Sequence, residues 1–172
     1  WLMRELERLN VYTCALPMPD PYFPKRDVWV NELARVIPQG PCADIYLVGH
    51  SLGVPTILNY LELHPDNTPF GGVFLVSGPC EKNETASEAT LKKLSHFYDH
   101  PFDFELIKKK SLHFSVLHGD DDQIVPLRHG QKLSAALNSP LLTIPKGGHL
   151  NGASGFYTLP QLLDEIVQVI KN

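Results

Sequence analysis

The sequence predicts an α/β fold in which a mostly parallel sheet is covered by helices on both faces. Short apolar runs alternate with segments of helical period along the 172 residues, which is the pattern of strands joined by crossover helices. The runs at 45–48 and 73–76 show no polar alternation, as expected of strands buried on both faces. A single domain, residues 1–172, suits this length.

The first half of the chain divides into helices and strands around a proline-rich connection. In order, we expect the end of a helix over 1–9, a strand over 11–16, a helix over 27–37, a strand over 45–48 and a helix over 52–63. Four prolines between Pro17 and Pro24 exclude regular structure there. Pro38 ends the helix before it, whereas Pro55 lies in a first helical turn, where a missing N–H costs little.

The second half of the chain continues the same alternation. We expect strands over 73–76, 114–118 and 141–144, a helix over 127–137 and a closing helix over 159–171. Residues 80–100 are polar and partly helical, and they form either a cap or a plain surface excursion. The run Lys108-Lys109-Lys110 is expected to be a solvated helix end.

Composition and charge favour a soluble protein and exclude several classes of partner. Hydrophobic residues make up 43% of the chain, and the formal net charge is −4, so no nucleic-acid partner is expected. No apolar run approaches the ~20 residues that cross a bilayer, and no signal peptide is visible, so we expect no membrane partner and a cytoplasmic location. Cys14, Cys42 and Cys80 have no disulfide or zinc spacing and are expected to be apolar fillers in a reducing compartment.

The motif Gly49-His50-Ser51-Leu52-Gly53 lies directly between a buried strand and a helix. A serine nucleophile must sit on a turn so tight that its hydroxyl projects above the sheet, and side chains at the two glycine positions would collide. The helix that follows would direct the Leu52 N–H at the reaction centre, where negative charge develops. The alternative is structural: Ser51 would cap the helix, and the glycines would only serve the turn.

A serine hydroxyl needs a base, and the base needs a carboxylate. Candidates follow in the order serine, acid, histidine, each after an expected strand. The acid is one of Asp120, Asp121 and Asp122, and the other two are expected to face solvent or cap the next helix. A turn without a role, or a metal site formed with His118, are the alternatives. The base is best placed at His149, on a loop at the carboxyl end of a strand.

The other histidines are weaker candidates for the base. The side chain of His50 should point away from Ser51 and pack beneath the turn, and His118 should pack inside the protein. The remainder lie in helical or surface contexts and are expected to be ordinary: His64, His96, His100, His113 and His129.

Three motifs together resemble those of a known family. GHSLG, HGDDDQIVP and KGGHL, followed by a closing helix in so small a chain, are similar to the serine hydrolases of the retinoblastoma-binding protein 9 and YdeN type. The stretch LPMPDPYFPKRDVWVNEL resembles that family's connection after its second strand. The resemblance implies a small α/β-hydrolase with nucleophile Ser51, base His149 and acid Asp122, three residues before Val125. Asp121 is the fallback, since the aspartate run permits a one-residue slip.

The chain departs from this family at its beginning. Members start with a strand and an HG-containing loop that supplies a second oxyanion donor, and nothing of that kind precedes Trp1. We therefore expect a chain that is truncated at its N-terminus and lacks this strand, with Leu52 as the remaining oxyanion donor. Losing one such donor typically costs ~10²–10³ in rate.

Three functions are compatible with these residues. The leading one is a serine hydrolase of small carboxylic esters, thioesters or amides, which acts through an acyl-enzyme on Ser51 without a cofactor or metal. The alternative is a protein-binding module on a hydrolase scaffold, with weak or no turnover and a protein partner. Such a module needs no serine, acid and histidine together, and the chain contains all three. Acyl transfer to a nucleophile other than water would use the same residues.

Overall fold

The centre of the fold is a parallel sheet. The structure, a computed structural model, describes residues 1–38, 40–63 and 69–171. The described strands are β1 (Tyr46–His50), β2 (Gly72–Val76), β3 (Phe114–Gly119) and β4 (Leu141–Ile144), and they lie side by side in that order. Every neighbouring pair of these strands is parallel. The carboxyl ends of all of them therefore lie at one edge of the sheet, where open α/β sheets bind their ligands.

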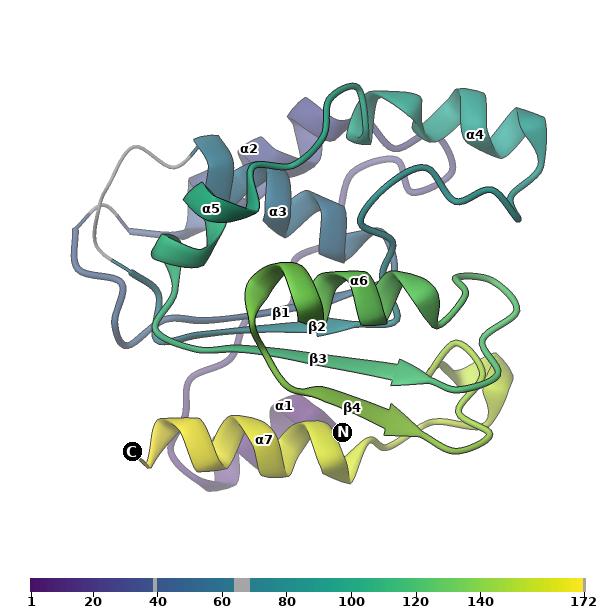
Figure 1. Cartoon of the computed structure of the whole chain (residues 1–172). Helices are drawn as coiled ribbons and strands as arrows, with labels where there is room; N and C mark the ends of the chain where they lie inside the picture. Colours follow the sequence, from purple (N-terminus) through teal and green to yellow (C-terminus); the bar gives the residue numbers. More distant parts are fainter. Residues whose placement is uncertain (39, 64–68, 172) are drawn as a thin grey trace.

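Helices cover both faces of this sheet (Figure 1). The helices on one face are α2 (Arg26–Val36), α3 (Gly53–Leu63), α4 (Glu88–Leu94), α5 (Phe104–Ile107) and α6 (Arg128–Leu137). The helices on the other face are α1 (Leu2–Arg8) and α7 (Pro160–Ile170). Three short 3-10 helices complete the described elements: η1 (Ser95–Phe97), η2 (Lys108–Lys110) and η3 (Gly152–Ser154).

Each face of the sheet has its own hydrophobic core. Every residue of β2 and β3 is buried, as the two-sided packing of a parallel sheet requires. In β1, an edge strand of the described sheet, buried and exposed residues alternate and Val48 is 43% exposed, so the expectation that 45–48 is buried on both faces is wrong. On one face α3 is buried continuously from Val54 to Leu61, because it lies against the sheet and also contacts α2. On the other face Leu162 and Ile166, four residues apart on α7, pack against the sheet with Phe74.

The structure confirms most of the predicted elements. The predicted strands 45–48, 73–76, 114–118 and 141–144 correspond to β1 to β4, and the predicted helices 1–9, 27–37, 52–63, 127–137 and 159–171 correspond to α1, α2, α3, α6 and α7. The predicted strand over 11–16 is wrong. That segment is irregular, and Tyr12 is 91% exposed. An isolated apolar run makes no strand without a neighbour to complete its hydrogen-bond ladder, and no described strand pairs with it.

Two smaller expectations meet mixed outcomes. Cys42 and Cys80 are buried fillers as predicted, whereas Cys14 is exposed. Lys108–Lys110 forms η2, but Lys110 is only 7% exposed, so the run is not a fully solvated helix end. Among the described residues, no helix has the length and apolar character that a membrane crossing needs.

Candidate active site

The turn between β1 and α3 holds Ser51 in a strained backbone conformation. Its φ is 54°, in the left-handed region that costs a residue with a side chain about 1–2 kcal/mol. Backbone hydrogen bonds keep the turn in place: Ser51 N–H donates to Val76 O at 2.9 Å, and Val54 N–H donates to Ser51 O at 3.0 Å. Strain of this kind persists where the surroundings enforce it, and it is commonest at functional sites.

The two glycines of the motif are not equivalent. A Cβ on Gly49 would lie 2.7 Å from Ile57 Cδ1 and 2.8 Å from Gly53 O, so the close packing of the strand on α3 requires glycine there. A Cβ on Gly53 would meet nothing within 4 Å. The expectation that both positions exclude a side chain is therefore right for Gly49 and wrong for Gly53, which already points away from the turn as the first residue of α3.

Asp122 is the aspartate that faces the histidine. It is 4% exposed, and its Oδ1 accepts hydrogen bonds from the N–H groups of Ile124 at 2.8 Å and Val125 at 2.9 Å. Its Oδ2 lies 2.8 Å from His149 Nδ1. Burial acts to raise the pKa of Asp122, but the hydrogen bonds from His149, Val125 and Ile124 outweigh it and hold that pKa below its ordinary value. The carboxylate is therefore ionised at neutral pH.

His149 joins this carboxylate to the serine. The residue is 5% exposed, and its Nε2 lies 2.9 Å from Ser51 Oγ. Because an ionised carboxylate can only accept, Nδ1–H donates to Asp122, and Nε2 is left to accept the hydroxyl proton of Ser51. The structure thus brings the three predicted residues together in one line of hydrogen bonds at the carboxyl edge of the sheet, with Asp122 and His149 buried and Ser51 partly exposed.

The other two aspartates hold the histidine loop. Asp120 Oδ1 accepts from the Lys146 N–H at 2.8 Å, and Asp121 Oδ1 accepts from the Gly148 N–H at 2.7 Å. Both side chains are exposed, as predicted. Neither of them caps α6, which has no side-chain cap. The run of three acids therefore fixes the backbone before His149 as well as its imidazole.

Two further histidines contact the site, and sequence reasoning missed both contacts. His118 is fully buried, as predicted; its Nε2–H donates to Val125 O at 2.8 Å and lies 3.5 Å from Asp122 Oδ2. Burial lowers its pKa, so it is neutral. His50 does not pack beneath the turn: its exposed side chain donates from Nε2 to His149 O at 2.8 Å. A buried histidine in a strand needs a hydrogen-bond partner, which was the available signal for His118.

The remaining histidines lie outside this line of hydrogen bonds. His129 lies in the helix α6, a helical setting as expected. It is 1% exposed and lies 3.9 Å from Cys80 Sγ, a contact that the sequence did not predict. The expectation for His64 lies outside the described residues. Within the described ranges, no three His, Cys, Asp or Glu side chains converge as metal ligands. The Nε2 of His118 is hydrogen-bonded to Val125 O.

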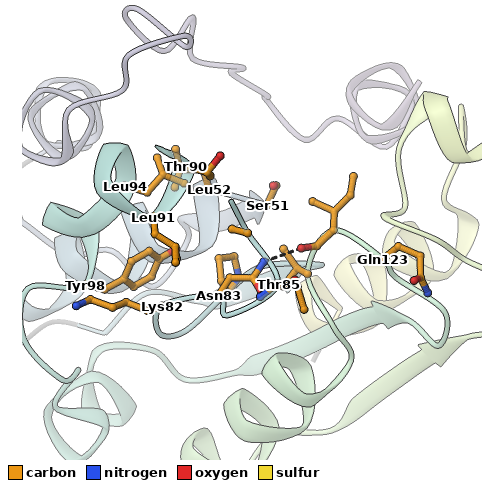
Figure 2. A pocket seen from close by; sticks show the side chains of 14 residues that line it. Ser51, Leu52, Lys82, Asn83, Thr85, Thr90, Leu91, Leu94, Tyr98 and Gln123 are labelled. Atoms are coloured by element: carbon orange, nitrogen blue, oxygen red, sulfur yellow. Dashed lines mark hydrogen bonds between the residues drawn. The ribbon is translucent and has the colours of Figure 1, made fainter. Parts of the chain in front are cut away.

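The N-terminus of α3 offers a donor beside the serine. The Leu52 N–H has no hydrogen-bond acceptor among the described residues, as expected before the first turn of a helix. Ser51 and Leu52 both line a pocket of about 290 Å³. Most of the other residues that line this pocket come from segment 79–98, which includes α4 (Figure 2). Of the two predicted roles for residues 80–100, a cap over the site is the one that the structure favours.

Comparisons with known proteins point to one family. Residues 4–168 match the family model for serine hydrolases. YdeN of Bacillus subtilis (strain 168) is 34% identical over 164 residues, which are 95% of this chain and 83% of that protein. The crystal structure of the ydeN gene product has a TM-score of 0.91 at 32% identity, and the match covers 100% of this chain and 89% of that one.

More distant relatives extend the similarity. Serine hydrolase RBBP9 of Rattus norvegicus is 22% identical over 174 residues, covering 100% of this chain and 83% of that protein. A structure from Xanthomonas campestris pv. campestris, assigned to the alpha/beta superfamily of hydrolases, has a TM-score of 0.63 at 17% identity, with 97% and 87% of the two chains covered. This last match bears on the fold alone. The resemblance and the fold expected from the sequence motifs are confirmed: the chain belongs to the serine hydrolase family and has a small α/β-hydrolase fold.

Proposed function

We propose that this serine hydrolase cleaves small carboxylic esters through an acyl-enzyme on Ser51, with His149 as the base and Asp122 as the acid that orients it. The observation that carries the proposal is the continuous line from Ser51 Oγ to His149 Nε2 at 2.9 Å and from His149 Nδ1 to Asp122 Oδ2 at 2.8 Å. If Ser51 served only to cap helix α3, it would need neither the buried imidazole of His149 nor the buried carboxylate of Asp122.

Acylation begins when Ser51 Oγ attacks the ester carbonyl carbon and its proton passes to His149 Nε2. Asp122 stabilises the imidazolium that forms, while the Leu52 N–H donates to the developing oxyanion. The C–O bond to the alcohol then breaks, and His149 returns the proton to the leaving oxygen. The acyl group is left on Ser51.

Deacylation repeats these steps with water as the nucleophile. His149 Nε2 takes a proton from water as its oxygen attacks the acyl carbon, and then gives that proton to Ser51 Oγ as the acid departs. Thioesters and amides fit the same sequence of steps, since only the leaving atom differs. We expect no metal or cofactor to take part.

A fluorophosphonate probe tests the assignment of Ser51. Wild-type protein should gain the mass of one phosphonyl group, and Ser51→Ala should gain none while its ester hydrolysis falls on the order of 10⁶-fold. Ser77→Ala is the matched control, because Ser77 also follows a strand in a positive-φ turn and its Oγ is buried without a partner among the described residues. Labelling of Ser51→Ala at the wild-type level would refute the proposal.

A further inference from the structure

The pocket beside Ser51 has an apolar wall. Its apolar lining consists of Pro79, Leu91, Leu94, Tyr98, Ile124 and Val125, besides Leu52 and Ala86. Lys82 is the one charged residue among those lining it, and its side chain is exposed. Figure 2 shows Leu91, Leu94 and Tyr98 grouped together, on the opposite side of the view from Gln123. Such a wall favours an apolar group and penalises a buried charge.

The position of His149 decides which half of an ester enters this pocket. The leaving oxygen must come within reach of His149 Nε2 to receive its proton. His149 is not among the residues that line the pocket, whereas Ser51 and Leu52 are. An alcohol held on the histidine side of the serine would leave the pocket to the acyl chain.

The volume of the pocket indicates how much of that chain it can bury. About 290 Å³ corresponds to roughly ten water molecules at ~30 Å³ each, and hence to about ten non-hydrogen atoms. We propose that the pocket is an acyl-binding site that accepts unbranched apolar acyl chains of about four to eight carbons. This inference rests on the proposed ester hydrolysis at Ser51 and specifies its substrate class.

Helix α4 supplies apolar side chains to the lining of the pocket. Leu91 and Leu94 are three residues apart and therefore share one face of the helix. Both are half-buried, and α4 has no fully buried residue. A second contact of α4 runs through Lys93, whose Nζ donates to Tyr22 O at 2.9 Å. Polar contacts hold the segment before α4: Asn83 Nδ2 donates to Ile124 O at 2.6 Å, and Glu81 pairs with Lys132.

Hydrolysis of p-nitrophenyl acetate, butanoate, hexanoate, octanoate and decanoate tests the inference. For the wild type, kcat/KM should rise about fourfold for each methylene group that the pocket buries, and it should fall again at decanoate. Leu94→Trp fills the pocket and should lower kcat/KM for octanoate at least tenfold relative to acetate. Leu94→Ala enlarges the pocket and should move the optimum to a longer chain.

Lys92→Trp is the matched control, because Lys92 is exposed on the same helix and does not line the pocket. It should leave the chain-length profile unchanged, and retained hydrolysis of acetate shows that each variant is folded. A profile that is flat in acyl length, or that follows the length of the alcohol instead, overturns the acyl-site inference while ester hydrolysis at Ser51 stands. Absence of Ser51-dependent hydrolysis for every ester overturns both.

Discussion

Three consecutive aspartates after β3 bind three different partners. Asp120 and Asp121 accept hydrogen bonds from the backbone before His149, and Asp122 accepts from its ring. The order of the run decides these tasks, since adjacent side chains leave the turn in different directions and only the third is buried. The loop position and the ring orientation of the histidine are thus both fixed by one short turn.

Substitutions in this run separate the two tasks. Asp122→Asn should lower kcat/KM on the order of 10⁴-fold, because an amide no longer enforces the Nδ1–H tautomer or stabilises the imidazolium. Asp121→Asn should cost less than about tenfold, since its Oδ1 acceptor for the Gly148 N–H survives. Hydrolysis of p-nitrophenyl butanoate measures both variants. Equal losses of kcat/KM in the two variants would contradict the assignment of Asp122 as the acid. A larger loss in Asp121→Asn would assign that role to Asp121.

At the scale of elements, the turn from β1 into α3 depends on how closely the strand approaches the helix. Gly49 lies against Ile57 and the backbone of Gly53, whereas Gly53 itself faces open space. Of the two glycines that flank Ser51 in the motif, packing therefore requires Gly49, whereas the space around Gly53 would admit a side chain.

Alanine at each glycine tests this difference. Gly49→Ala should lower the free energy of unfolding by about 1–3 kcal/mol, since an added methyl forces the strand and helix apart, and it should also reduce Ser51 labelling. Gly53→Ala should be neutral or stabilise by up to ~1 kcal/mol, because alanine is the better helix former. Urea unfolding followed by circular dichroism measures both. A destabilised Gly53→Ala would contradict the open space beside that residue.

The sequence predicts elements well where the signal is local. β1 to β4 are centred on short apolar runs, although Ser115, His118 and Thr143 interrupt two of them. The proposed site residues Ser51, Asp122 and His149 lie in motifs that each follow a strand. Residues 11–16 have the same apolar character, but a strand also requires a neighbour at hydrogen-bonding distance, which composition does not reveal. The contacts of His118 and His50 escaped prediction for a similar reason, because their partners are carbonyl groups of residues that only the fold brings near.

At the scale of the whole molecule, buried histidines link stability to pH. His118 and His129 are at most 1% exposed, and burial lowers the pKa of each below the ordinary histidine value. Between the folded and unfolded pKa values, the unfolded chain binds protons that the folded chain does not, so stability falls as the pH drops below about 6.5. Asp122 adds a second loss of stability, which begins only below about pH 4, because its pKa is lower in the folded protein than in the unfolded chain.

Urea midpoints at pH 8, 7, 6 and 5 test this linkage. The midpoint should fall between pH 7 and 5, and His129→Gln should flatten the fall because it removes one of the buried groups. His100→Gln should steepen it: hydrogen bonds to Asp99 and Glu62 raise the pKa of the exposed His100, which therefore stabilises the fold at low pH and loses that effect as the pH rises. Parallel slopes in all three proteins would contradict the assignment.

The order of the strands also decides when the site is completed during synthesis. Each described strand pairs with the one before it in the chain, so the sheet can be assembled strand by strand as the ribosome delivers it. The serine follows the first of these strands, and its proposed base follows the last. A nascent chain therefore carries the hydroxyl of Ser51 without the proposed general base, and an interrupted translation product that ends before residue 149 never acquires it.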